Sequence, residues 1–230
     1  MITIRRKPDF KKNFYEQAAW SENKLVCGID EVGRGCLAGP VVAAAAILKN
    51  PKISRLVKDS KIMTPEERLQ AFDWINANAW YAIGIVHHRL IDQVNIYYAT
   101  QLAMKRAVMQ LLVQVPQKPS CIVVDAMPIE LKNFDGEIIA FPHGESKSSS
   151  IAAASIVAKV TRDLLMQRLD SVFPGYALAQ HKGYATAEHK LSLENQSTSL
   201  IHRTTFLKSL SMLDESQLSL FDTTNTSENV

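Results

Sequence analysis

The sequence has 230 residues and a mass of 25.6 kDa, and 47% of its residues are apolar, enough to bury a sizeable core. The longest apolar run, residues 41–48, is too short to span a bilayer, and three cysteines without CxxC spacing argue against a disulfide scaffold. We therefore expect a cytoplasmic protein with reduced thiols and no membrane association. Four acids and no lysine or arginine follow residue 208, and subtracting them from 23 leaves 19 acids against 26 bases, a net charge of +7, in residues 1–208. Such a basic body suits a polyanionic partner.

The hydrophobic pattern predicts a mixed α/β domain preceded by a basic, amphipathic, helical extension over residues 1–24. Thr64, Pro65 and Glu67 have the spacing of a helix N-terminus with a capping box. In chain order we expect a strand at 25–29, a strand at 41–48, a helix from about 65 to 76, a strand at 80–87, a helix at 97–112, strands at 121–124 and 138–141, a helix at 151–173, and a broken helical segment at 186–213.

Two adjacent acids, Asp30 and Glu31, follow the first expected strand and precede a glycine-rich turn. Neighbouring side chains of a regular strand point to opposite faces, so both acids can face one site only if the strand bends there, which Gly33 permits. Asp125, after the strand at 121–124, supplies a third acid, and three carboxylates would suit Mg²⁺ or Mn²⁺. Most isolated Asp-Glu pairs are ordinary loop acids, so this motif by itself leaves both interpretations open.

The glycine-rich turn, Gly33-Arg34-Gly35, matches neither a phosphate-binding P-loop nor the dinucleotide fingerprint. A Gly-Arg-Gly turn exposes backbone N–H and C=O groups beside a cation. We expect such a turn to contact a sugar hydroxyl and a phosphate.

Five motifs, in order along the chain, resemble those of the ribonuclease HII family. They are Asp30-Glu31-x-Gly33-Arg34-Gly35, then Asp59-Ser60-Lys61, then Val123-Val124-Asp125-Ala126-Met127, then the helix from Ser150 to Asp163, and finally the segment from Tyr176 to Tyr184. The resemblance runs from about residue 25 to about residue 206.

The resemblance implies a ribonuclease H-like fold, in which helices flank a five-stranded mixed sheet and a helical segment follows. It also implies an endonuclease for RNA paired with DNA and for ribonucleotides embedded in duplex DNA. The cut would fall 5′ to the ribonucleotide and leave 3′-hydroxyl and 5′-phosphate ends. We expect a monomer whose catalytic domain spans residues 25–213, with a flexible tail at 214–230.

Site residues follow from the same resemblance. It implies metal binding by Asp30, Glu31 and Asp125, a fourth catalytic acid at Glu145, recognition of the 2′-hydroxyl by Gly33, Arg34, Gly35 and Tyr184, and a phosphate contact at Lys61. The implied cofactor is Mg²⁺ or Mn²⁺.

Three positions depart from the family pattern. Glu145 stands where Asp is usual, so its carboxylate lies one methylene farther from the backbone. Cys36 replaces a usual Pro, and we expect its thiol to be buried and inert. His143 replaces a usual Lys.

The tail contains Gln217-Leu218-Ser219-Leu220-Phe221, which resembles the peptide that docks bacterial proteins on the DNA sliding clamp. Gln217, Leu218, Leu220 and Phe221 are the expected contacts, and the alternative is a last helical turn packed on the body.

Other interpretations remain at this stage. Rival enzymes are a ribonuclease HIII or a DNA-specific nuclease of the same fold, and a rival of another class is a non-catalytic nucleic-acid-binding module. His181 and His189 lack the spacing of a common zinc site. Lys159 and Arg162 could equally form a solvated helix face or contact backbone.

Overall fold

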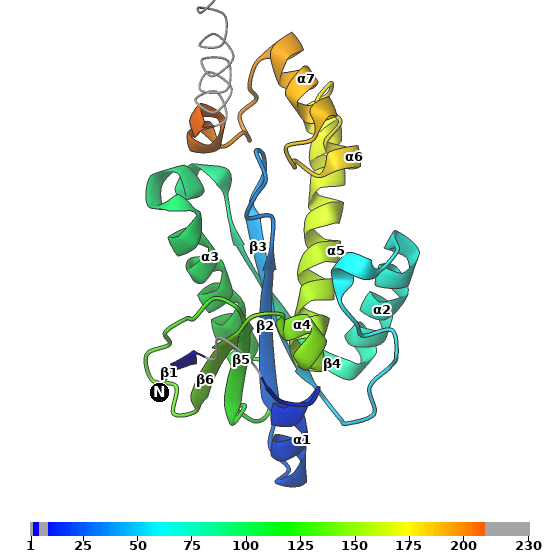
Figure 1. The fold of residues 1–230 in the computed structure, drawn as a ribbon, viewed down its shortest axis with the longest axis vertical. Helices are drawn as coiled ribbons and strands as arrows, with labels where there is room; N and C mark the ends of the chain where they lie inside the picture. The colour runs from blue at the N-terminus through cyan, green and yellow to red at the C-terminus, as the bar shows by residue number, and fades with distance from the viewer. Residues whose placement is uncertain (1, 5–8, 210–230) are drawn as a thin grey trace, which may run out of the picture.

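A central six-stranded sheet organises the part of the chain that the structure, a computed structural model, describes, namely residues 2–4 and 9–209. The sheet order is β1-β6-β5-β2-β3-β4 (Figure 1). The strands are β1 (Ile2–Ile4), β2 (Val26–Val32), β3 (Val41–Leu48), β4 (Ala79–Val86), β5 (Cys121–Asp125) and β6 (Glu137–Phe141). The main helices are α1 (Phe14–Ser21), α2 (Pro65–Asn78), α3 (His88–Leu112), α4 (Gly144–Lys147), α5 (Ser149–Val172), α6 (Leu178–His181) and α7 (Ala187–Gln196).

The expected ribonuclease H-like mixed sheet is present, but it has six strands in place of five. The pairs β2–β3 and β3–β4 are antiparallel, whereas β2–β5, β5–β6 and β1–β6 are parallel. The added strand, β1, lies in the segment expected to be helical, and α1 is the one helix among the residues of that segment that the structure describes. Three residues are too few for a periodic hydrophobic signal, and β1 exists because its backbone pairs with the edge strand β6.

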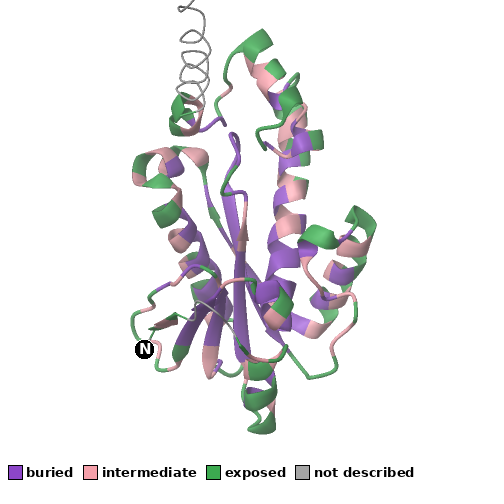
Figure 2. Cartoon of the chain, viewed as in Figure 1, coloured by how far each residue is buried: buried purple, intermediate pink, exposed green. Residues whose placement is uncertain are grey.

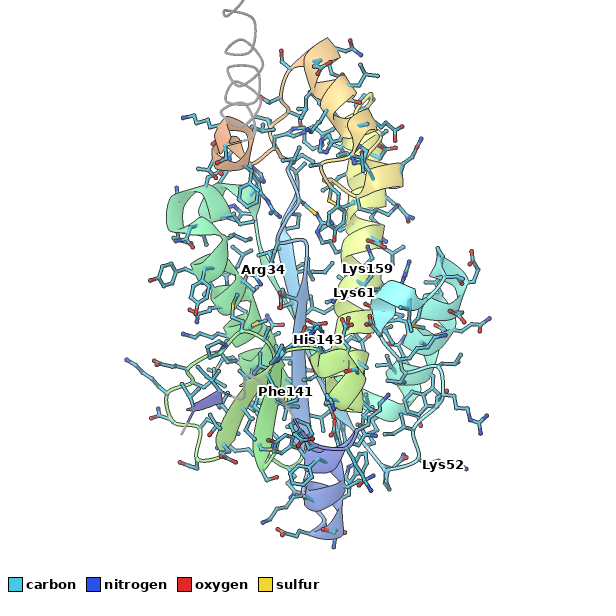
Figure 3. The ribbon with its side chains drawn as sticks, viewed as in Figure 1. Arg34, Lys52, Lys61, Phe141, His143 and Lys159 are labelled. Atoms are coloured by element: carbon cyan, nitrogen blue, oxygen red, sulfur yellow. The ribbon has the colours of Figure 1, made fainter. Side chains whose placement is uncertain are left out.

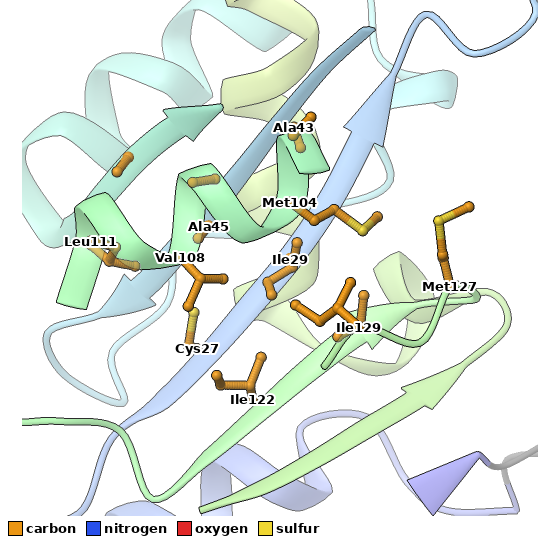
Figure 4. Close-up of a cluster of buried hydrophobic side chains, with 14 of the residues drawn as sticks. Cys27, Ile29, Ala43, Ala45, Met104, Val108, Leu111, Ile122, Met127 and Ile129 are labelled. Atoms are coloured by element: carbon orange, nitrogen blue, oxygen red, sulfur yellow. The ribbon is translucent and has the colours of Figure 1, made fainter. Parts of the chain in front are cut away.

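Helices cover both faces of the sheet. Figure 1 shows α3 on one side of the sheet and α5 on the other, with α2 packed outside α5. Alternation along β3 sends Ala43 and Ala45 into the core under α3 (Figure 4), while Ala44 and Ala46 pack under α5 and α2. Because β3 is buried on both faces (Figure 2), its run of small apolar residues lets two helix layers approach closely.

Most element boundaries agree with the sequence prediction. Thr64 caps α2 through a complete capping box with Glu67, as expected. The helix α3 begins earlier than expected, at His88, but it is interrupted at Asn95, where φ is 66°. The Asn95 side chain accepts hydrogen bonds from the backbone N–H groups of Tyr97 and Tyr98, so the second part of α3 has its own cap.

The C-terminal region is helical and broken, as predicted, over the part that the structure describes. After α7, residues 204–209 are again helical. Asp92 caps this last helix by accepting hydrogen bonds from the backbone N–H groups of Thr204 and Thr205 at 2.9 and 3.0 Å. Within residues 2–4 and 9–209, none of the helices combines the length and apolar character needed to cross a membrane.

The contact between β2 and the start of α5 depends on Gly28. A Cβ atom at Gly28 would lie 2.1 Å from the carbonyl carbon of Ser150, which is backbone and cannot turn away. Glycine therefore allows α5 to lie directly on β2, and this close approach brings the residues of α4 and α5 next to the acids of β2.

We predict that Gly28→Ala destabilises the protein by about 1–3 kcal/mol, because the added methyl group must push α5 away from the sheet. The matched control is Gly35→Ala, since a Cβ there would meet nothing within 4 Å. Urea denaturation of the two variants and the parent tests this. Equal midpoints for Gly28→Ala and Gly35→Ala would contradict the account of the contact.

Candidate active site

Asp30 and Glu31 lie inside β2, not after it. The strand continues to Val32, and the acids pair in regular register with Ala44 and Ala43 of β3. The expected strand end at residue 29 is therefore wrong: β2 keeps its regular register with β3 through both acids, and the chain turns only after them, at Gly33. The acids come together differently: on its other side β2 pairs with β5 only up to Ile29, so both acids extend beyond the last paired residue of β5.

Asp125 ends β5 and lies beside the two acids of β2. Its Oδ1 accepts a hydrogen bond from the backbone N–H of Gly144 at 2.8 Å. This bond ties the end of β5 to the start of α4, the short helix that carries Glu145. The strands β2 and β5 and the helix α4 thus bring their acids together at the carboxyl ends of the two parallel strands.

Glu145 is buried and held by neighbours from two other elements. Its Oε1 accepts a hydrogen bond from Ser155 Oγ of α5 at 2.5 Å and lies 3.5 Å from Lys61 Nζ. Ser155 Oγ is in turn 2.7 Å from Ser60 Oγ. The segment Asp59-Ser60-Lys61 therefore contacts Glu145 directly through Lys61 and indirectly through Ser60 and Ser155. The longer side chain of Glu145 is accommodated by these hydroxyl and ammonium groups.

The acids are crowded, and their pKa values reflect it. Burial, with the charges of Glu31 and Asp125, raises the pKa of Asp30 well above its ordinary value. Burial also raises the pKa of Glu31, although Arg34 NH1 lies 3.3 Å from Glu31 Oε1 and opposes this effect. Burial raises the pKa of Glu145 as well. The acids together carry more negative charge than the nearby cations neutralise.

Two cations contact the acidic group: Arg34 lies beside Glu31, and Lys61 lies beside Glu145. Figure 3 labels both residues, with His143 near them in this view. The side chain of Lys61 is 74% exposed, so its ammonium group is available to a ligand as well as to Glu145. Although burial opposes it, the neighbouring acids raise the pKa of Lys61. His143 is exposed immediately before α4.

The acids fit a divalent cation. Asp30 Oδ2 and Glu31 Oε2 are buried and have no hydrogen-bond partner. Buried carboxylate oxygens without partners are costly, and a hard cation satisfies them. In the described part of the chain, no three His, Cys, Asp or Glu side chains form a ready-made metal cluster. Asp125 and Glu145 are held by Gly144 and Ser155, so Asp30 and Glu31 offer the free oxygens.

The loop between β2 and β3, residues 33–40, is held by two buried arginines. Arg203 donates to the carbonyl oxygens of Gly33, Arg34 and Gly39 at 2.7–3.0 Å. Arg162 donates to the carbonyl oxygens of Pro40 and Ala38 in this loop, and of Lys182 outside it, at 2.8–3.1 Å. Both arginines are fully buried.

This arrangement decides between the interpretations of Arg162 and corrects the expectation for the loop. Arg162 contacts backbone and is not part of a solvated face. The carbonyl groups of Gly33 and Arg34, expected to be exposed, face Arg203, so the N–H groups are what the turn offers a ligand. Gly33 has φ +88°, and a Cβ there would meet Arg162 Nε at 2.2 Å, so glycine is required.

Arg203 was missed by the sequence analysis, and Arg162 was only half recognised. Arg162 follows Ala158 and precedes Met166 at four-residue spacing, and both neighbours are buried, so helical periodicity could have placed it on the inner face of α5. No comparable signal marks Arg203, because its partners lie about 165 residues away in the sequence.

Tyr184 lies against the β2–β3 loop. Its backbone pairs with that of Cys36, and its ring is 37% exposed with Lys159 Nζ and Arg162 Cζ each 5.7 Å from the ring centroid. Cys36 is buried, as expected, and burial raises the pKa of its thiol, which favours the unreactive protonated form. The structure thus brings Tyr184 to the loop that contains Gly33, Arg34 and Gly35, and Arg34 of this loop contacts Glu31. Gln217, Leu218, Leu220 and Phe221 lie outside the described residues.

Solved structures with this fold define the class of protein. The chain matches the ribonuclease H2 of Pyrococcus horikoshii OT3 with a TM-score of 0.66 and 28% identity, over 79% of this chain and 93% of that one. It matches Bst-RNase HIII, solved with Mn²⁺, with a TM-score of 0.61 and 21% identity, over 82% and 70% of the two chains. The fold is that of a ribonuclease H-type hydrolase.

The sequence relatives give the family. The ribonuclease HII family model matches residues 27–209. The ribonuclease HII of Levilactobacillus brevis is 48% identical over 193 residues, which cover 84% of this chain and 72% of that protein. That of Listeria monocytogenes serotype 4b is 43% identical over 204 residues, covering 88% and 76%. The chain belongs to the ribonuclease HII family, which confirms the resemblance and the enzyme class, with the dependence on a divalent metal that the family implies.

We predict that Asp30→Asn raises the melting temperature of the metal-free protein at pH 7. The pKa of Asp30 is raised by folding, so its ionised form costs stability at neutral pH; that cost declines as the pH falls through the raised pKa and is gone only below the ordinary pKa of an aspartic acid. The same substitution should abolish the increase in melting temperature that Mn²⁺ gives the parent, because a ligand that binds only the folded state stabilises it.

Thermal melts in EDTA and in Mn²⁺ make this measurement, with Asp73→Asn, on the exposed face of α2, as the matched control. The control should keep the Mn²⁺-induced shift of the parent. An equal shift in Asp30→Asn would show that the cation binds elsewhere.

Proposed function

We propose that this protein is an endonuclease that cuts the RNA strand of RNA–DNA hybrids and also cuts duplex DNA on the 5′ side of an embedded ribonucleotide. The products would carry 3′-hydroxyl and 5′-phosphate ends. The observation that carries the proposal is the contact of the β2–β3 loop with the acids: Arg34 NH1 lies 3.3 Å from Glu31 Oε1. A sugar bound on the loop therefore has its phosphate beside the carboxylates.

Asp30, Glu31 and Asp125 would hold Mg²⁺ or Mn²⁺, with Glu145 as a fourth acid, and the cations would supply an activated water and neutralise charge on the phosphate. The exposed ammonium group of Lys61 contacts Glu145, and we assign it to a neighbouring phosphate oxygen. Glu145, which accepts a hydrogen bond from Ser155, orients this lysine and would help to hold the cation.

Recognition of the ribose falls to the loop and to Tyr184. A 2′-hydroxyl is the group that distinguishes a ribonucleotide from a deoxyribonucleotide, and it can donate and accept a hydrogen bond. The N–H groups at Gly33, Arg34 and Gly35 approach a sugar more closely than side chains could. The partly exposed ring of Tyr184 offers an apolar surface for the neighbouring sugar. Arg162 and Arg203, buried beneath the loop, add positive charge where a phosphate must approach.

The test uses three labelled duplexes with Mg²⁺: one with a single embedded ribonucleotide, one continuous RNA–DNA hybrid and one all-DNA duplex. We predict a single cut 5′ to the embedded ribonucleotide, cuts in the hybrid and no cut in DNA. Asp125→Asn should lower the rate by more than about a hundredfold, because loss of a group that merely supports a metal ligand already costs 10–100-fold.

Each alternative outcome identifies a rival. Cleavage of the all-DNA duplex would favour a DNA-specific nuclease of the same fold. Binding of all hybrids without any cleavage would favour a non-catalytic module. Cleavage of the hybrid alone would restrict the proposal to its first half. An embedded ribonucleotide is a feature of chromosomal DNA, which agrees with the expected cytoplasmic location.

We also propose that the tail, through Gln217, Leu218, Leu220 and Phe221, docks the enzyme on a DNA sliding clamp. These residues lie outside the described part of the chain, so the support comes from the motif and from a relative. The ribonuclease HII of Archaeoglobus fulgidus, which shares the fold at a TM-score of 0.65 and 23% identity over 78% of this chain and 94% of that one, was solved in a complex with PCNA.

A labelled peptide of residues 212–224 should bind the purified clamp with roughly micromolar affinity, because a segment that orders on binding loses part of its interaction energy. Fluorescence anisotropy measures this binding. The control peptide carries Leu220→Ala and Phe221→Ala, which remove the two apolar anchors. Equal binding by both peptides, or none by either, would assign the segment to an ordinary terminus.

A further inference from the structure

Three buried histidines lie next to the segment that carries Tyr184, and nothing in the proposed chemistry uses them. His181 ends α6, His189 is in α7, and His202 lies in the segment that leads to Arg203. The rings of His181 and His189 stack with centroids 4.2 Å apart, and His189 Nε2 is 3.0 Å from His202 Nε2. Figure 1 shows α6 and α7 beside the upper end of α5, near the loop that joins β2 and β3.

The hydrogen bonds determine which ring nitrogen of His202 and of His189 carries the proton. The backbone N–H of Ser199 donates to His202 Nδ1 at 3.0 Å, so the proton of a neutral His202 is on Nε2. That proton is donated to His189 Nε2, which must then be unprotonated. The proton of His189 is therefore on Nδ1, 2.9 Å from the carbonyl oxygen of Tyr184. A chain of donors runs from Ser199 through both rings to the backbone of Tyr184.

His181 completes the group without joining this chain. Its Nδ1 accepts from the backbone N–H of Gly183 at 3.1 Å, and its Nε2 donates to the carbonyl oxygen of Tyr176 at 2.6 Å. All six ring nitrogens of the three histidines thus have partners, which leaves none to ligate a metal. Burial lowers the pKa of His202 to about 4 and lowers that of His189, so the relay is neutral at pH 7.

The backbone of His202 faces the β2–β3 loop. It pairs with Ala38, while the N–H of Gly39 donates to the carbonyl oxygen of Ile201 at 2.9 Å and the N–H of Arg203 to that of Leu37 at 2.8 Å. His202 therefore contacts the loop through its backbone and Tyr184 through its side chain and His189. These are the two halves of the surface to which we assign ribose recognition.

We propose that His202 and His189 are positioning residues that set the substrate specificity of this enzyme. Their directional hydrogen bonds fix the backbone of Tyr184 at a set distance from the β2–β3 loop, so that the ring and the N–H groups fit one ribose together. This inference rests on the proposed function, because it gives Tyr184 and the loop their role in recognition. Displacement of a positioning group by about 1 Å can cost a hundredfold in rate.

The first test examines the relay without any activity measurement. Long-range ¹H–¹⁵N correlation spectra of the folded enzyme at pH 7 distinguish the two neutral tautomers of histidine. We expect the Nε2–H tautomer for His202 and the Nδ1–H tautomer for His189. A proton on Nε2 of His189, or a charged ring at either position, would overturn the relay.

The second test uses two variants that differ by one methylene. His202→Gln can place an amide N–H near the position of Nε2 and still donate to His189, whereas His202→Asn can only replace the Nδ1 acceptor. We expect His202→Asn to lower kcat on the single-ribonucleotide duplex about tenfold more than on the continuous hybrid, with KM little changed. His202→Gln should recover most of this loss. Tyr184→Ala should show the same selective loss as His202→Asn.

The outcomes separate this inference from the proposed function. Equal ratios of the two activities in the parent, His202→Asn and His202→Gln would overturn the positioning role, and melting temperatures of the two variants exclude unfolding as the cause of a difference. Failure of the parent itself to cut the single-ribonucleotide duplex would instead overturn the proposed function, and the specificity role of the histidines with it.

Discussion

Two guanidinium groups buried among backbone carbonyls, with no acid paired to either in the part of the chain that the structure describes, are the constraint on which the rest of this structure depends. Burying an unpaired charge is costly, and the cost is offset because all three nitrogens of Arg162 and of Arg203 donate hydrogen bonds to carbonyl oxygens. The planar guanidinium presents five donors in a rigid fork, whereas lysine presents three on a flexible stem. The β2–β3 loop is therefore fixed in one conformation before any ligand arrives.

That fixed loop organises the site on both sides. On one side it holds Arg34 beside Glu31, and on the other it pairs Cys36 with Tyr184. The close approach of α5 to β2 at Gly28 also shapes the site, because it brings Ser155 and Glu145 next to Asp30. The resulting group of acids repels itself, so the site stores unfavourable electrostatic energy that a divalent cation would relieve. The acids that the proposed chemistry needs therefore lower the stability of the metal-free protein.

The sequence predicts the elements and the acids well, because both leave local signals. Strand β3 is a short apolar run, Thr64 begins a capping box, and Asp125 follows a β-branched strand. The extent of β2 is missed because acids occupy two of its last three positions and interrupt the hydrophobic pattern. Arg203 is missed for a different reason: its partners are main-chain carbonyls far away in the sequence, and main-chain partners leave no complementary residue type to recognise.

We infer that Arg162, Arg203 and the histidine relay preform the surface to which we assign ribose recognition. The most direct measurement is a crystal structure of Asp30→Asn with a duplex containing one ribonucleotide. The account predicts that the 2′-hydroxyl contacts the backbone at Gly33, Arg34 and Gly35, that Tyr184 packs on the adjacent sugar, and that the bonds from Arg203 to the loop carbonyls remain. A ribose bound elsewhere, or a loop that leaves Arg203 to reach the substrate, would contradict it.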